Sequence, residues 1–574
     1  MKNITFPLSV ALLGFLFASA VLLPHVLQRL DHEYPFQGIS IMATDAETHY
    51  AARYREILDG HPELGNTYLS APKDQPSVQP PLPEWSLAML SRALPFDPVL
   101  SFVLLTGLCA FITFCTAVLM TASITGRRYE SLAAVAVMLF AAAPFGTPWN
   151  VLNVLSSGSF ADFGWLRFAR PVNPLWTMPL FFTTVFFFSR WVRKAEILWI
   201  VCAAIMTTVL LYSYFYAWTY LLATAGVLFL FYAWKKEKKR LWHLLLYFAL
   251  FLFLGSGYFL DLAGLIQHPW YLDSSRHQGL VSSRLPVVGA WLIALVVLSV
   301  LGKRIAWKEQ FPLVLALALG GAIAMNQQVM TSQHLFPEHY HWYFVQPLGT
   351  LFFALLILLF ARKHLRAALY DFFLCSIIAA SLVVGFLQQR DTYGTYRSEW
   401  GGLQNLAPLF SYVGERVPKD TVAYSQDAFV MDLLPVYTSM NVYTSAQASN
   451  YLLPASRLRD MLFFTLWLQG IMPKDAGLQF PTTLRRTLGT DIYGSYYREL
   501  RGDYAALPDE LVEEHVREYS RYYALPLQRK LSLYPLDYVI VSPSDTKTQQ
   551  YRLLLSGGRS VYAGPGYELI ELRK

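Results

Sequence analysis

Long apolar runs alternate with short polar stretches along the first two thirds of the chain. Runs of roughly twenty apolar residues match a hydrocarbon core about 30 Å thick. The pattern therefore predicts an α-helical polytopic membrane domain over residues 1–390. We expect about eleven transmembrane helices, with approximate ranges 5–27, 98–123, 130–147, 174–190, 196–215, 217–234, 241–265, 285–302, 311–326, 343–361 and 367–388.

The first run admits two interpretations. Lys2 and the Phe17-Ala18-Ser19-Ala20 sequence resemble a cleaved signal peptide, but the apolar run continues to Leu27. We interpret it as a retained helix. Both interpretations place residues 28–97 outside the cell.

Basic clusters follow every second predicted helix, which indicates that one face of the protein is cytoplasmic. Residues 28–97, 148–173, 266–284, 327–342 and the tail from about 389 are then extracytoplasmic. We expect a multi-pass protein of the inner or plasma membrane. The basic clusters are Arg127-Arg128, Arg190 with Arg193-Lys194, Lys235 to Arg240, Lys303-Arg304 with Lys308, and Arg362-Lys363 with Arg366.

The tail has a different pattern, because its apolar runs shorten to strand length. Residues 421–424 and 538–541 are typical of strands, and 560–562 with 567–572 predict a hairpin across Ala563-Gly564-Pro565-Gly566. Helical patterns cover 427–436, 454–470 and 507–523. We therefore predict an extracytoplasmic α/β domain over 391–574.

Composition supports the membrane assignment, since 55% of residues are hydrophobic and only 15% are charged. The net charge of +7 comes from basic clusters between apolar runs, so nucleic acid is not an expected partner. The four cysteines lie inside apolar runs without metal-ligand spacing, and no disulfide framework is implied. They are Cys109, Cys115, Cys202 and Cys375.

The first loop, about seventy residues long, carries the most suggestive chemistry. Its segment from Asp45 to Leu58 has helical spacing, with Asp45, His49 and Glu56 on one face. This predicts an amphipathic helix along the outer membrane surface. Thr44 with Glu47 also forms a capping box, and an acid suits the start of a helix. The residues alone leave a catalytic and a helix-capping role of Asp45 equally open.

Other polar clusters begin helices on the same outer face. Arg167 and Arg170 lie in the second loop, where they would bind either phosphate or lipid headgroups. Glu338, His339 and His341 precede a later helix. They would line a cleft or sit at the membrane interface, and interfacial placement suits His341 better. Weaker candidates are Arg276, His277, Lys73 and Asp74.

The first ninety residues resemble the GT-C superfamily of membrane glycosyltransferases. The resemblance consists of an acid just after the first helix, the pattern Asp-Ala-Glu…Tyr-Ala…Arg-Glu-Ile-Leu-Asp-Gly, and a Pro-Pro-Leu segment. The superfamily includes protein O-mannosyltransferases, the lipid A aminoarabinose transferase and the oligosaccharyltransferase catalytic subunit. The resemblance implies transfer of a sugar from a polyprenyl-phosphate donor to a glycan, lipid or protein acceptor, with Asp45 as the catalytic carboxylate.

The resemblance and the residues together assign roles to the candidates. Asp45 and Glu47 are the catalytic candidates, and Asp45 would take the acceptor's proton. Six residues would bind substrate: Arg167, Arg170, His339, Glu338, Arg276 and His49. The superfamily contains metal-dependent and metal-independent members, so a divalent cation, Mg²⁺ or Mn²⁺, stays open as a cofactor.

Two departures and two alternatives accompany this prediction. The tail lacks the Trp-Trp-Asp-Tyr-Gly signature, and the second loop lacks a clear acidic pair, which argues against an oligosaccharyltransferase. A transporter or flippase is disfavoured because polar clusters gather at one surface and no two-fold repeat is visible. A non-catalytic partner in envelope polysaccharide assembly stays open. We expect the tail to cap the cleft and to help select the acceptor.

Overall fold

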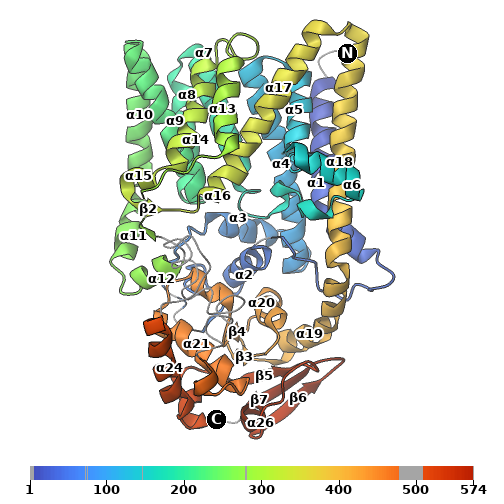
Figure 1. The fold of residues 1–574 in the computed structure, drawn as a ribbon, viewed down its shortest axis with the longest axis vertical. Helices are drawn as coiled ribbons and strands as arrows, with labels where there is room; N and C mark the ends of the chain where they lie inside the picture. Colours follow the sequence, from blue (N-terminus) through green and yellow to red (C-terminus); the bar gives the residue numbers. More distant parts are fainter. Residues whose placement is uncertain are drawn as a thin grey trace.

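The computed structural model describes residues 5–44, 46–70, 73, 75–144, 147–277, 281–282, 284–476 and 509–572. The molecule is elongated, with a helical bundle at one end and an α/β region at the other (Figure 1). The chain begins at the far end of the bundle, whereas its C-terminus lies in the α/β region. The first loop lies between the two, so it shares one end of the bundle with the C-terminal region.

Helices occupy all eleven predicted ranges of the bundle. Within the described residues, six helices are long and apolar enough to cross a membrane. A seventh span is formed if α10 and α11, bent by 55°, are counted together. The chain is a multi-pass membrane protein, and the count of eleven stays a prediction. The bundle helices are α1 (Thr5–Arg29), α4 (Pro98–Thr125), α5 (Arg128–Phe140), α7 (Thr177–Lys194), α8 (Ile197–Leu211), α9 (Phe215–Trp234), α10 (Lys238–Leu254), α11 (Ser256–Ile266), α13 (Ala290–Leu301), α14 (Phe311–Met325), α17 (Gln346–His364) and α18 (Ala367–Gly402).

Small residues allow the bundle helices to approach closely, as is common in membranes. A Cβ atom added to Gly385 of α18 would lie 2.5 Å from Phe140 Cδ1 of α5. One added to Gly320 of α14 would lie 2.5 Å from Thr224 Oγ1 of α9. At these crossings the helix backbones pack directly against neighbouring side chains.

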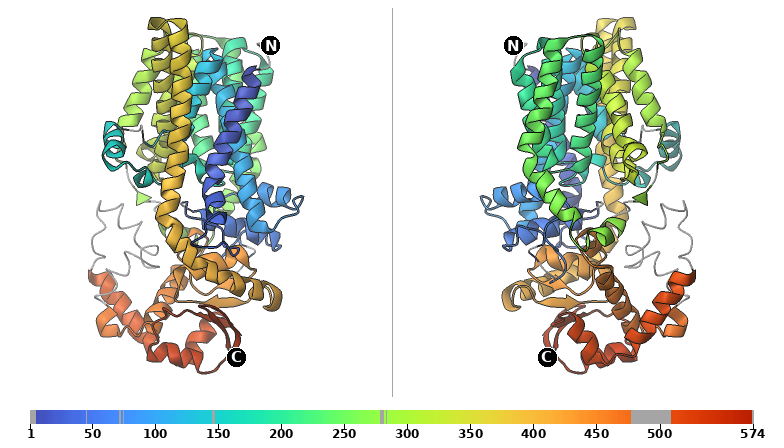
Figure 2. Two further views of the ribbon diagram at one scale, coloured as in Figure 1. Left: turned by 90° about the vertical axis from the view of Figure 1, so that its right-hand side faces the viewer. Right: turned by 90° about the vertical axis from the view of Figure 1, so that its left-hand side faces the viewer.

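The last bundle helix extends further than its sequence pattern predicts. α18 continues beyond residue 388 to Gly402, so its final turns leave the bundle and reach the α/β region (Figure 2). Arg397 in this extension donates through Nη2 to Asp31 Oδ1 at 2.6 Å, and Tyr393 donates to Asp31 Oδ2 at 2.8 Å. These bonds attach the start of the first loop to α18.

Short helices and strands connect the bundle helices on the side that faces the α/β region. The strands β1 and β2 pair antiparallel there. The elements are α2 (Glu47–Leu58), α3 (Leu82–Ser91), α6 (Pro148–Ser157), η1 (Ala161–Phe163), η2 (Arg167–Ala169), α12 (Tyr271–His277), β1 (Val281–Ser282), α15 (Gln328–Thr331), β2 (Gln333–His334), α16 (Pro337–Tyr340) and η3 (His341–Val345).

The C-terminal region contains a five-stranded mixed sheet in the order β4-β3-β5-β7-β6. β3 runs parallel to β4 and β5, while β7 is antiparallel to β5 and β6. The two predicted single strands and the predicted hairpin are confirmed, and helices lie in the three predicted ranges. The elements are η4 (Leu403–Leu406), α19 (Ala407–Arg416), β3 (Val422–Tyr424), α20 (Ala428–Tyr437), β4 (Asn441–Val442), η5 (Ala446–Asn450), α21 (Ala455–Leu468), α24 (Asp509–Tyr523), α25 (Leu527–Leu533), β5 (Tyr538–Val541), α26 (Gln549–Leu555), β6 (Gly558–Ala563) and β7 (Glu568–Leu572).

The first loop and the C-terminal region share one hydrophobic core, distinct from that of the bundle. Val442 of β4 donates its backbone N–H to Tyr68 O at 2.8 Å. Tyr451 donates to Thr67 Oγ1 at 2.7 Å, and Tyr437 accepts from Ser40 N at 2.8 Å. The boundary at residue 390 stays a prediction, but the loop 28–97 packs as part of this C-terminal core.

The expectation that α2 lies along the membrane surface is wrong, because the helix is buried on nearly all sides. Two of its charged residues, Arg53 and Glu56, are paired inside the protein. Arg53 Nε contacts Glu84 Oε1 of α3 at 2.6 Å, and these side chains are only 1% and 2% exposed. Glu56 pairs with Lys73 at 2.7 Å. The polar face that suggested a water-facing helix is thus covered by the rest of its own loop and by α20.

Breaking the Arg53–Glu84 pair should destabilise the protein. Glu84→Gln leaves a buried guanidinium without its counter-ion, and we expect a loss of about 3–5 kcal/mol. Thermal unfolding of the purified protein in detergent measures this loss. The control Glu33→Gln removes a carboxylate that is 62% exposed, for which we expect less than about 1 kcal/mol. Equal unfolding temperatures for the two variants would contradict the prediction.

Candidate functional site

Arg170 joins three parts of the chain at the end of the bundle that faces the α/β region. It directly follows η2 in the second loop, and its side chain is buried, with 9% exposed. Its Nη1 donates to the Tyr343 hydroxyl of η3 at 3.1 Å. Its guanidinium carbon lies 5.5 Å from the centre of the Tyr50 ring on α2. A buried side chain of this kind does not reach lipid headgroups, so the snorkelling alternative fails for Arg170.

Arg167, one turn earlier, contacts the same segment of the chain. Its Nη1 donates to Gln346 Oε1, and its guanidinium carbon lies 4.2 Å from the centre of the Trp342 ring. Burial lowers the pKa of Arg167 to about 10, so the side chain stays charged at neutral pH. Two cations from one loop are therefore held against η3 and the start of α17.

His339 of α16 lies beside this pair. Its Nδ1 is hydrogen-bonded to the Tyr214 hydroxyl at 2.6 Å, and its ring stacks on Tyr216 at 4.5 Å. The ring centre of Tyr343, which accepts from Arg170, is 5.7 Å from that of His339. The structure thus brings Arg167, Arg170 and His339 into one cluster. Glu338, the residue before His339, is exposed, and its predicted role in substrate binding stays a prediction.

The first-loop candidates have different surroundings. Asp45 lies outside the described residues. Glu47 is buried and accepts from the backbone N–H and hydroxyl of Thr44 at 3.1 and 2.6 Å. Burial raises the pKa of Glu47 to about 7. Its carboxyl therefore fastens the segment before α2. Only this half of the predicted capping box forms, because α2 is preceded by Ala46 and no side chain caps its first N–H groups. The catalytic role of Glu47 stays a prediction.

His49 points into the shared core. Its ring is parallel to that of Tyr68, with centres 6.3 Å apart, and lies 5.6 Å from the Tyr451 ring. Burial, together with the charges of Arg53 and Arg170, lowers the pKa of His49 well below its ordinary value. The imidazole is therefore neutral. The side chain of Arg276 lies outside the described residues, and its predicted role stays untested.

Sequence reasoning missed the tyrosines that surround the cations. Tyr50 lies on α2, Tyr216 on α9 and Tyr343 on η3, while Tyr214 directly precedes α9. The sequence pattern indicated only aromatic residues at a membrane interface. The sequence did contain one sign of these residues, the aromatic run from Tyr212 to Tyr220. Several tyrosines concentrate there, at the point where two predicted membrane spans nearly touch. No group of three or more His, Cys, Asp or Glu suited to a metal ion occurs among the residues that the structure describes.

No protein-family model matches the sequence, and no curated protein matches it. Solved structures that are similar to this chain include ArnT from Cupriavidus metallidurans bound to undecaprenyl phosphate and the same protein in the apo state. Both are 14% identical over 97% of each chain, with TM-scores of 0.44 and 0.42.

ArnT is the lipid A aminoarabinose transferase and has the GT-C fold.

The buried Glu47 carboxyl should make stability depend on pH. Its pKa in the folded chain, about 7, exceeds the ordinary value of 4.5. The contribution of Glu47 to the free energy of unfolding is therefore fully present below about pH 4.5 and is lost as pH rises through 7. We expect Glu47→Gln to gain stability relative to the parent protein over this range, by up to about 3 kcal/mol. Unfolding temperatures at pH 5 to 8 measure this gain, and Glu415→Gln, at an exposed position, should show no such trend.

Proposed function

We propose that the protein is a GT-C-like membrane glycosyltransferase. It moves a sugar from an outward-facing polyprenyl-phosphate carrier to an extracytoplasmic acceptor. The observation that carries the proposal is the cluster of Arg167 and Arg170 with His339 and its tyrosines. These cations lie where the bundle meets the first loop. A carrier embedded in the membrane presents its phosphate at that level.

The arginines suit the leaving phosphate. A guanidinium binds phosphate oxygens through two parallel N–H donors, and such charge-assisted bonds are roughly twice as strong as neutral ones. Arg170 is held by Tyr343 and Arg167 by Gln346, so both forks are oriented before substrate arrives. Hydroxyl groups of the surrounding tyrosines add further donors.

The reaction needs a base and a leaving group. In our proposal the Asp45 carboxylate takes the proton of an acceptor hydroxyl. The freed oxygen attacks the anomeric carbon from the face opposite the carrier, and the bond from that carbon to the phosphate oxygen breaks. The carrier phosphate leaves with the bonding electrons, beside Arg170 and Arg167. The product is inverted at the anomeric carbon.

The solved structure of ArnT with undecaprenyl phosphate contains a carrier of the proposed class. We propose the same class of carrier here, with the first loop and C-terminal region outside the cell. The basic clusters on the opposite ends of the helices support this orientation.

Sugar transfer by the purified protein tests the class and the base together. The protein in detergent is offered a panel of polyprenyl-phosphate sugars, and Asp45→Asn is assayed beside it. We expect transfer by the parent protein and a loss of about 10²–10⁴-fold in kcat in the variant. Unchanged transfer by a folded Asp45→Asn protein would return Asp45 to a helix-capping role. Absence of transfer with every donor would refute the enzyme proposal.

Donor affinity tests the cationic cluster. Arg170→Gln removes one charged donor from the phosphate, and we expect the donor KM to rise by about 10- to 100-fold. Arg390→Gln is the matched control, because Arg390 lies on the same outer side but its side chain is 61% exposed. A donor KM that is equal in the two variants would place the phosphate elsewhere.

A further inference from the structure

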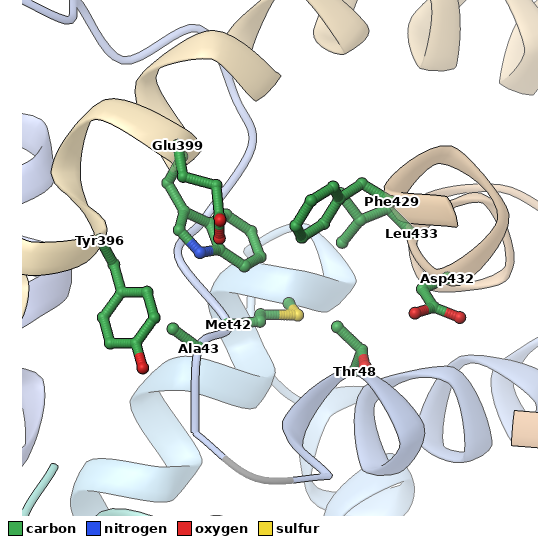
Figure 3. A pocket seen from close by; sticks show the side chains of 9 residues that line it. Met42, Ala43, Thr48, Tyr396, Glu399, Phe429, Asp432 and Leu433 are labelled. Carbon is green, nitrogen blue, oxygen red and sulfur yellow. The ribbon is translucent and has the colours of Figure 1, made fainter. Parts of the chain in front are cut away.

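A pocket of about 220 Å³ lies between the first loop and the C-terminal region. Three chain segments form it: the segment around the start of α2, the last turns of α18, and α20 (Figure 3). Its volume is below the range typical of drug-sized ligands, so it suits one small group. The lining residues are Met42, Ala43, Thr48, Tyr396, Glu399, Trp400, Phe429, Asp432 and Leu433.

The pocket combines carboxylates with aromatic rings. Asp432 and Glu399 supply acceptor oxygens, and Thr48 supplies a hydroxyl. Tyr396 comes from α18 and Phe429 from α20 (Figure 3). Phe429 is 41% exposed, which leaves a large apolar ring facing solvent at this site. Among the residues that the structure describes, the lining contains no lysine or arginine.

Trp400 adds a buried donor that lacks a partner. Its side chain is only 3% exposed, and within the described residues its Nε1–H makes no hydrogen bond. Indole nitrogen is a donor only, and buried donors are ordinarily paired. A ligand that fills the pocket would supply the missing acceptor.

The pocket is connected to the cationic cluster. The Tyr396 ring stacks on Trp165 of the second loop, with ring centres 5.7 Å apart. Trp165 precedes Arg167 by two residues. Met42, Ala43 and Thr48 bracket position 45 in the sequence. The pocket therefore borders the two segments to which the proposed function assigns the donor and the base.

We propose that this pocket binds one neutral sugar ring of the acceptor. A sugar hydroxyl both donates and accepts, so it can donate to Asp432 and Glu399 and accept from Trp400. An apolar sugar face suits Phe429 and Tyr396. An ammonium group would only donate and would leave Trp400 unpaired, and a phosphate would be repelled by the carboxylates. The identification of the ring as the acceptor's rests on the proposed function.

Binding of simple glycosides tests the pocket without catalysis. The full-length protein in lipid nanodiscs is titrated with neutral methyl hexosides, hexosamines and hexose phosphates, and saturation-transfer NMR reports the bound ligand. We expect a neutral methyl hexoside to bind more tightly than its amino and phosphorylated counterparts. Trp400→Phe and Asp432→Asn should each weaken it at least about 10-fold, the ratio expected for one lost hydrogen bond to a charged or buried partner.

Matched controls keep the test specific. Trp85→Phe changes a tryptophan that is 42% exposed on α3, and Glu415→Gln changes an exposed carboxylate of α19. Both should bind the hexoside as the parent protein does. Phe429→Leu, at an exposed position, provides a second pocket variant if Trp400→Phe does not fold. Absence of hexoside binding, equal loss in pocket and control variants, or preference for an amino or phosphorylated sugar would overturn the proposal.

Transfer kinetics separate this proposal from the proposed function. With an active donor and acceptor, Asp432→Asn should raise the acceptor KM and leave the donor KM unchanged. Hexoside binding without any sugar transfer would refute the proposed glycosyltransferase activity and support the proposed sugar-binding pocket. If the protein transfers sugar, Asp432→Asn leaves the acceptor KM unchanged and no hexoside binds, the proposal of a sugar-binding pocket is refuted. The proposal of a glycosyltransferase is then retained.

Discussion

The buried pair of Arg53 and Glu84 determines how the first loop folds. A guanidinium that is almost fully buried is tolerated only with a paired and hydrogen-bonded anion. The pair therefore fixes α2 against α3. Once α2 is placed, Tyr50 lies against Arg170 and the opposite side of the helix packs on α20. The cationic cluster and the pocket both depend on this placement.

The two candidate sites lie on either side of one short helix. The cationic cluster faces the bundle, where the tyrosines of α9 and η3 surround it. The pocket faces the α/β region, with walls from α18 and α20. The charged cluster therefore lies on one side of α2 and the carboxylate-lined pocket on the other. The chemistry of a phosphate-bearing lipid and that of a hydroxylated acceptor differ in the same way.

Local patterns predicted the elements well, because apolar periodicity and turn residues act over short distances. The hairpin across Gly564-Pro565-Gly566 and the strand at 538–541 are examples. Burial of α2 was not predictable, since the charge of Arg53 is balanced by Glu84, thirty-one residues further along the chain. Arg170 and His339 were recognised individually, but their shared neighbour Tyr343 depends on tertiary packing. Trp400 was not recognised as a pocket residue from the sequence, because the apolar pattern of the last predicted span ends at residue 388.

The length of α18 has a mechanical consequence. At 1.5 Å per residue its thirty-six residues form a rod about 54 Å long. One end lies among the bundle helices, away from the α/β region, and the other carries Tyr396, Glu399 and Trp400. A continuous helix of this length moves largely as one body, so a tilt at one end also moves the other end. A small rotation of α18 within the bundle would therefore displace one pocket wall by several times the movement made near its pivot, as a lever does.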